Sequence, residues 1–171
     1  AGKTYVTLLD NGAYSFHYLQ MRFTGVALRP RTAGIYYKCL WNCDDMLLAQ
    51  LQNFGVALSL AHTPDSNFAS DEETLYTAMD AATLARGESF TSVMVENIFD
   101  AAAEDNGNRG TTDIHAVPYV ILKDGTTVVG DGNVAYSLYD VLKQMDVLSF
   151  YYANKTALEG FAETWSSAMA D

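Results

Sequence analysis

Apolar and β-branched residues dominate the first 32 positions in a pattern typical of β-strands. Residues 5–9 form one such run, and they lead into Asp10-Asn11-Gly12, a strong signal for a hairpin turn. Residues 13–20 are candidates for the partner strand and residues 22–28 for a third strand, while the aromatic stretch 14–19 also fits a short helix. Pro30 closes the segment, so we expect residues 1–32 to form an N-terminal β-rich extension.

The next segment has the pattern of a buried strand followed by a helix. Residues 33–38 are mostly apolar or aromatic and lead directly into Cys39 and Cys43. The apolar positions from Met46 to Phe54 recur near helical spacing, Asn42 is a plausible N-cap, and residues 53–55 end the helix. Residues 56–61 then form a short apolar run of the strand type.

Residues 70–108 change character and predict a helical insertion. Residues 70–73, with the sequence SDEE, match a capping box, and the helix that they open is expected to end near Arg86-Gly87. A second helix is expected from about residue 91 to residue 104, followed by a loop rich in Asn and Gly.

The clearest local pattern is a hairpin over residues 117–129, whose two apolar runs are separated by an Asp124-Gly125 turn. A helix is expected from about residue 134 to residue 145. The tail, residues 147–171, is expected to be helical from about residue 156 to residue 169.

Composition limits the class of protein. The chain has 171 residues, about half of them apolar, which is enough for one folded domain with a substantial core. The formal net charge of −11 argues against binding to nucleic acid or to an anionic membrane surface, because both need clustered Lys and Arg. No apolar run approaches the roughly 18 residues of a membrane-spanning helix.

The two cysteines are the strongest candidates for chemistry. A cysteine at a helix N-terminus has a lowered pKa because the helix dipole stabilises the thiolate, and a second thiol one turn away can resolve a mixed disulfide. No Ser-His-Asp, phosphate-loop or dinucleotide fingerprint is evident in the sequence.

The order of these elements, together with the segment HAVPYVILKDGTTVVGDG before the next expected helix, resembles the thioredoxin superfamily. Within that superfamily it is similar to the bacterial periplasmic thiol-disulfide oxidoreductases and isomerases of the Dsb type, over about residues 33–146. The resemblance implies a thioredoxin-like α/β fold with a helical insertion. It also implies that Cys39 is the nucleophile, that Cys43 is the resolving thiol, and that Val117-Pro118 is a cis peptide holding the substrate backbone.

The same resemblance implies protein substrates with thiols or disulfides, no dissociable cofactor and an extracytoplasmic, for example periplasmic, location. The chain begins at Ala1 rather than Met, a start that fits a cleaved signal peptide and an artificial start equally well. Trp41, between the thiols, is either a substrate contact or a core anchor.

Three alternatives remain open, because the family spacing is CxxC and this chain has three residues between its thiols. The pair is also compatible with a structural disulfide or with two buried free thiols. The spacing also resembles that of copper-binding Sco-type proteins, which implies a copper site at Cys39, Cys43 and His115. The third alternative is a non-enzymatic interaction or scaffold protein of an envelope complex, with a protein partner bound through the N-terminal extension.

Overall fold

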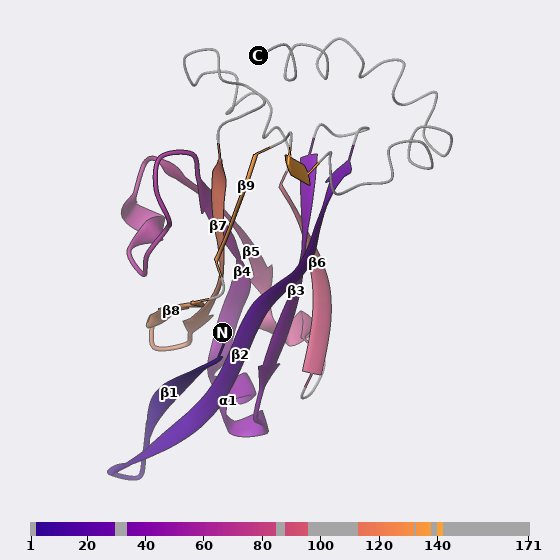
Figure 1. Ribbon diagram of the computed structural model, residues 1–171. Helices are drawn as coiled ribbons and strands as arrows, with labels where there is room; N and C mark the ends of the chain where they lie inside the picture. The colour runs from indigo at the N-terminus through magenta and orange to yellow at the C-terminus, as the bar shows by residue number, and fades with distance from the viewer. Residues whose placement is uncertain are drawn as a thin grey trace.

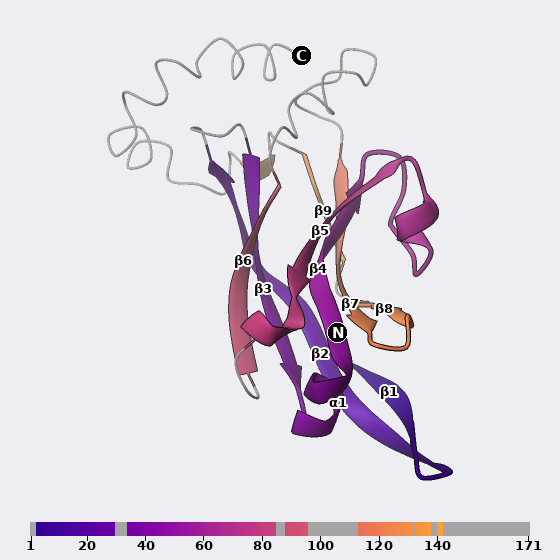
Figure 2. The ribbon, with the colours of Figure 1, turned by 180° about the vertical axis from the view of Figure 1, so that it is seen from behind.

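Two antiparallel β-sheets account for most of the chain described by the computed structural model, which covers residues 3–29, 34–84, 88–95, 113–131, 133–137 and 140–141. The first sheet has the order β1-β2-β3-β6, with strands β1 (Lys3–Asp10), β2 (Ala13–Arg29), β3 (Gly34–Cys43) and β6 (Glu88–Val95). The second has the order β5-β4-β7-β8, with strands β4 (Leu51–Ser59), β5 (Thr74–Asp80), β7 (Ile114–Leu122) and β8 (Thr127–Val129). A short strand, β9 (Val134–Tyr136), also pairs with β7. The two sheets form a sandwich (Figures 1 and 2).

Three short helical segments connect these strands: α1 (Asp45–Gln50), η2 (Phe68–Ser70) and η3 (Ala81–Thr83). The described chain therefore contains both kinds of regular structure, with strands dominant. Within the described ranges, no helix combines the length and the apolar character needed to cross a membrane.

Both predicted hairpin turns are confirmed. Asn11 and Gly12 have φ values of 49° and 79°, the left-handed conformation that a two-residue type I′ turn requires at both positions. Gly125, with φ 90°, occupies the other turn, where its N–H donates to the carbonyl of Leu122 over 2.9 Å. These turns set the registers of β1 with β2 and of β7 with β8.

The N-terminal segment belongs to the sandwich itself. The two runs expected as separate strands, 13–20 and 22–28, form the single long strand β2, with a register shift between Phe23 and Gly25. β2 lies between β1 and β3, and its Leu19 and Met21 are buried in the main core. The hairpin end of β1 and β2 extends beyond the rest of the sandwich (Figure 1).

The core forms because alternate side chains of each sheet point to the other sheet. Trp41 from β3 and Phe54 from β4 meet there in an edge-on contact, with ring centroids 4.9 Å apart. The opposite face of the second sheet is also covered, since Phe68 of η2 packs on Tyr119 of β7. This double coverage explains why β4 and β7 are buried on both faces.

The expected helical insertion is wrong where the structure describes it. Residues 74–80 form strand β5 and residues 88–95 form strand β6, in place of the two expected helices. The Asp71 side chain accepts from the Glu73 N–H, a local turn that replaces the predicted helix cap, and β5 then pairs with β4. Residues 96–112, which include the rest of the second expected helix, lie outside the described residues.

The segment around the cysteines also differs from the thioredoxin-like expectation. Both cysteines lie in strand β3, and α1 begins only at Asp45 with Asp44, not Asn42, as its N-cap. β3 and β4, the strands on either side of α1, belong to different sheets, and every described strand pair is antiparallel. A strand-helix-strand unit of an α/β sheet would instead place these two strands parallel in one sheet.

The end of the expected thioredoxin-like region differs as well. Residues 134–136, predicted to begin a helix, form strand β9 against β7. The expected C-terminal helix at 156–169, and the whole tail 147–171, lie outside the described residues.

Candidate functional site

The two cysteines are free thiols inside the sandwich. Cys39 has no exposed surface and Cys43 is 7% exposed, and both belong to the main core cluster. Burial raises the pKa of Cys39 far above its ordinary value. Burial, together with the nearby carboxylates of Asp44 and Asp45, raises the pKa of Cys43 to about 11. Both groups are therefore protonated thiols at neutral pH, whereas nucleophilic attack needs the thiolate.

The geometry of β3 keeps the two thiols apart. Four residues along a strand span roughly 13 Å, whereas a disulfide joins Cα atoms only about 4.4–6.8 Å apart. The even spacing places both side chains on the core face of β3, with Trp41 between them. Trp41 is 2% exposed and packs on Phe54. Of the two roles expected for Trp41, substrate contact or core anchor, this position matches the core anchor.

Val117 and Pro118 lie in the middle of β7, in the sheet that does not contain the cysteines. The prediction of a cis bond before Pro118 is wrong, because no described peptide bond is cis. Proline fits here because one edge of β7 is unpaired at this point. β8 and β9 share that edge, but β8 pairs with β7 only from Tyr119 onwards and β9 only up to Ala116. The Pro118 carbonyl points into this gap and accepts from the Gly130 N–H over 2.8 Å. The N–H and C=O of one strand residue point to the same side, so the N–H that proline lacks would also face the gap, and no ladder hydrogen bond is lost.

His115 is not brought to the cysteines. It alternates along β7 with Ile114 and Ala116, which point into the main core, so its own side chain lies on the opposite face of the second sheet. Among the described residues, no group of three His, Cys, Asp or Glu side chains is arranged to hold a metal ion.

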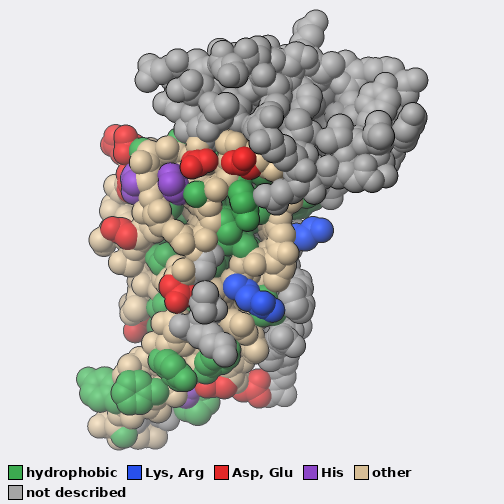
Figure 3. Space-filling view, in the orientation of Figure 1, with side chains coloured by type: hydrophobic (Ala, Val, Ile, Leu, Met, Phe, Trp, Pro, Cys, Tyr) green, Lys and Arg blue, Asp and Glu red, His purple; other side chains and the backbone are tan. Residues whose placement is uncertain are grey.

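A surface that sequence reasoning did not identify lies on the outer side of the β1–β2 hairpin. Its register places six side chains on this side as three cross-strand pairs: Tyr5 with Tyr18, Thr7 with Phe16, and Leu9 with Tyr14. Tyr5, Leu9, Tyr14 and Phe16 are 62–76% exposed, and none of the six carries a charge. We call these six residues the hairpin face; Figure 3 shows the hydrophobic side chains gathered at this end of the molecule.

The signal for the hairpin face was present in the sequence. In a strand with one buried side, polar residues normally occupy the alternate positions that face solvent. In residues 5–9 and 14–18, however, both sets of alternate positions are largely apolar or aromatic. One set, which includes Val6 and His17, is buried, so the other set must be exposed.

The inner side of the same hairpin carries a chain of three polar side chains. Ser15 Oγ lies 2.7 Å from His17 Nε2, and His17 Nδ1 lies 2.8 Å from Asp44 Oδ2. His17 is 5% exposed, whereas the Asp44 side chain is 46% exposed. Partial burial acts to raise the pKa of Asp44, but hydrogen bonds from the Leu47 N–H and from His17 outweigh it and hold this pKa below its ordinary value.

Sequence reasoning found no Ser-His-Asp arrangement because its members are brought together by the fold. The pattern Ser-x-His places Ser15 and His17 on one face of a strand. Asp44 reaches them only because β3 ends opposite Leu19 of β2, so that the N-cap of α1 lies beside His17.

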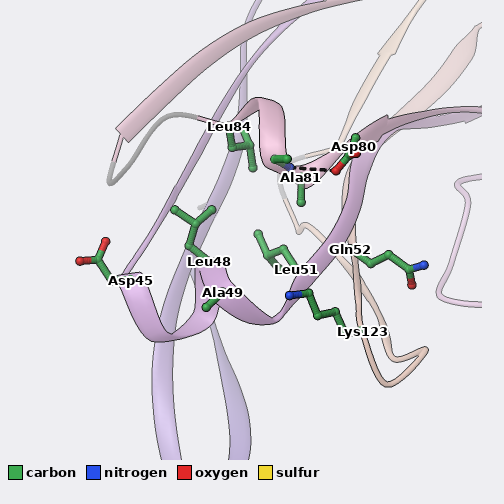
Figure 4. A pocket seen from close by; sticks show the side chains of 10 residues that line it. Asp45, Leu48, Ala49, Leu51, Gln52, Asp80, Ala81, Leu84 and Lys123 are labelled. Carbon is green, nitrogen blue, oxygen red and sulfur yellow. Dashed lines mark hydrogen bonds between the residues drawn. The ribbon is translucent and has the colours of Figure 1, made fainter.

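A pocket of about 520 Å³ lies between α1, the start of β4 and η3 (Figure 4). Leu48, Leu51 and Leu84 supply apolar lining, while Asp45, Asp80 and Lys123 supply both signs of charge. The Asp80 carboxylate is engaged, since it accepts from the Ala82 N–H over 2.9 Å. With two carboxylates and one ammonium group, the lining carries a net formal charge of −1.

Comparison with protein-family models, with curated proteins and with solved structures finds no match to this chain.

Proposed function

We propose that this chain is an interaction module that binds an extended segment of another polypeptide at the β1–β2 hairpin. The observation that carries the proposal is the hairpin face, an uncharged and largely aromatic surface at the end of an otherwise acidic protein. Contiguous exposed apolar surface on a soluble protein marks interaction sites, and tyrosine is enriched at such sites.

The edge of β1 supports a partner in the form of a strand. Among the described strands, β1 pairs only with β2, so its outer edge offers backbone N–H and C=O groups to a further strand. A segment added there would extend the sheet and place alternate side chains beside Tyr5, Thr7 and Leu9. Backbone pairing would supply affinity, and the exposed aromatic rings would select apolar residues at every second position.

Charge favours a different polypeptide over a second copy of this chain. The net charge of −11 makes two copies repel each other, whereas a neutral or basic segment is not repelled. The proposed partner segment is therefore extended, neutral or basic, and apolar at alternate positions.

The thiol-disulfide function expected from the cysteines has less support than this. It would require a reactive thiolate and two sulfurs within bonding reach. Neither requirement is met by buried, protonated thiols at opposite ends of a five-residue strand segment.

The test is a selection from a phage library of random 12-residue peptides against the intact chain, followed by anisotropy measurements with the enriched peptides. We expect the enriched peptides to carry a neutral or positive charge and apolar residues at alternate positions. Phe16→Thr, which keeps a β-prone residue on the strand, should weaken their binding at least tenfold, about 1.4 kcal/mol.

The matched control is Leu75→Thr, which removes a residue of β5 that is 48% exposed in the other sheet. This variant should bind the peptides as the unchanged chain does. Enriched peptides that bind Phe16→Thr and the unchanged chain equally would overturn the proposal. A concentration-dependent dimer in sedimentation, abolished by Phe16→Thr, would replace the proposed partner with a second copy.

A further inference from the structure

We propose that Ser15 is a nucleophile, activated by His17 and Asp44, that attacks neutral carboxylic esters. This inference is independent of peptide binding at the hairpin face, because the three residues lie on the inner side of the hairpin and the six residues of the hairpin face lie on its outer side.

The arrangement has the connectivity that nucleophilic catalysis by serine requires. The hydroxyl and the carboxylate contact different ring nitrogens of His17: Ser15 Oγ lies 2.7 Å from Nε2, and Asp44 Oδ2 lies 2.8 Å from Nδ1. A nucleophile within hydrogen-bond reach of a base that a third group orients is the defining geometry of such sites.

The hydrogen-bond network assigns the proton positions. Asp44 is ionised at neutral pH, because its hydrogen bonds from the Leu47 N–H and from His17 keep its pKa low despite partial burial. A carboxylate only accepts hydrogen bonds, so His17 must carry its proton on Nδ1. In the neutral ring, the form in which an imidazole acts as a general base, Nε2 presents its lone pair to the Ser15 hydroxyl.

A second histidine shows what distinguishes this group. His62 Nε2 lies 2.8 Å from Asp71 Oδ2 and its Nδ1 lies 3.7 Å from Glu73 Oε2. Both nitrogens therefore face carboxylates, and the side chain is 44% exposed. His17 has a carboxylate on one side only, is almost completely buried, and offers its other nitrogen to a hydroxyl.

Ser15 is partly exposed to solvent. β3 pairs with β2 only from Leu19 onwards, so Ser15 lies beyond the end of β3, in the part of the hairpin that extends from the sandwich (Figure 1). Its cross-strand neighbour is Leu8, an apolar residue that packs against the main core. The carboxylates of Asp44 and Asp45 would repel an anionic acyl group, which is why the proposal names neutral esters.

The chemical step balances with water as the second reactant. Ser15 Oγ forms a bond to the ester carbonyl carbon while its proton passes to His17 Nε2, and that proton then leaves with the alcohol as the ester C–O bond breaks. Water next attacks the acyl group, again giving a proton to Nε2, and the Oγ–C bond breaks to release the carboxylic acid and restore the Ser15 hydroxyl.

The experiment treats the intact chain with a fluorophosphonate, a probe whose phosphorus forms a bond to an activated serine oxygen as fluoride leaves. We expect one adduct, located on Ser15 by tandem mass spectrometry, and hydrolysis of p-nitrophenyl acetate above the buffer rate. Ser15→Ala should lose both, and Asp44→Asn should slow adduct formation at least tenfold.

The matched control is Ser70→Ala, because the Ser70 hydroxyl donates to the Asn67 carbonyl and has no imidazole partner. This variant should react as the unchanged chain does. A purely structural role for the three residues would lower the melting temperature of Ser15→Ala but give no adduct in the unchanged chain, and that result would overturn the proposal. Because the adduct is mapped on the unchanged chain, the test does not depend on any variant folding.

Discussion

At the scale of single residues, environment decides what a side chain can do. Cys39 and Cys43 attract attention in the sequence, yet burial raises the pKa of both thiols and the Asp44 and Asp45 carboxylates add to the effect at Cys43. Ser15 looks ordinary in the sequence, yet its hydroxyl lies against an oriented imidazole. Residue type and spacing along the chain indicate candidates, and the fold selects among them.

The state of the two thiols can be measured directly. We expect iodoacetamide at pH 8 to leave the native chain essentially unmodified, because thiolates are scarce and buried, and to modify both cysteines after denaturation. Intact mass spectrometry reads both results. The denatured sample is the control, since it holds the same thiols without the fold. If mild oxidation of the native chain removed two mass units, a disulfide would have formed and both cysteines would resist alkylation even after unfolding. That result would contradict the separation of the two thiols along β3.

At the scale of elements, the sequence was informative where local chemistry decides the conformation. Asn11-Gly12 and Asp124-Gly125 identify their turns because few residues accept positive φ. The pattern failed for residues 74–80, where a cap-like sequence suggested a helix but pairing with β4 imposes a strand. The group of Ser15, His17 and Asp44 also depends on strand pairing, because Asp44 meets His17 only through the register of β2 with β3.

Two strand glycines test the packing of these elements. A Cβ on Gly55 of β4 would overlap the Thr77 carbonyl oxygen, which also accepts from the Tyr119 hydroxyl over 2.7 Å. Gly55→Ala should therefore destabilise the chain by about 3 kcal/mol or more, because β5 must move away from β4. Gly25→Ala is the matched control, since its nearest contact is Lys38 Cδ at 3.6 Å. Equal melting temperatures for the two variants would contradict the close approach of β4 and β5.

At the scale of the whole molecule, the sandwich separates stability from the proposed functions. The core joins the two sheets through contacts such as that between Trp41 and Phe54. The hairpin face and Ser15 lie where β1 and β2 extend past β3, outside this core. Large apolar residues in the two regions should therefore respond differently to truncation.

Trp41→Ala and Phe16→Ala measure this separation. Trp41 is 2% exposed, so its loss should cost about 3–5 kcal/mol in the free energy of unfolding. Phe16 is 76% exposed, so its loss should cost less than about 0.5 kcal/mol. Urea unfolding followed by circular dichroism gives both values. In the unchanged chain, tyrosine fluorescence should give the same urea midpoint as circular dichroism, because the two sheets share one core and unfold together. Comparable losses for the two variants would contradict the separation, since Phe16 would then be part of the core.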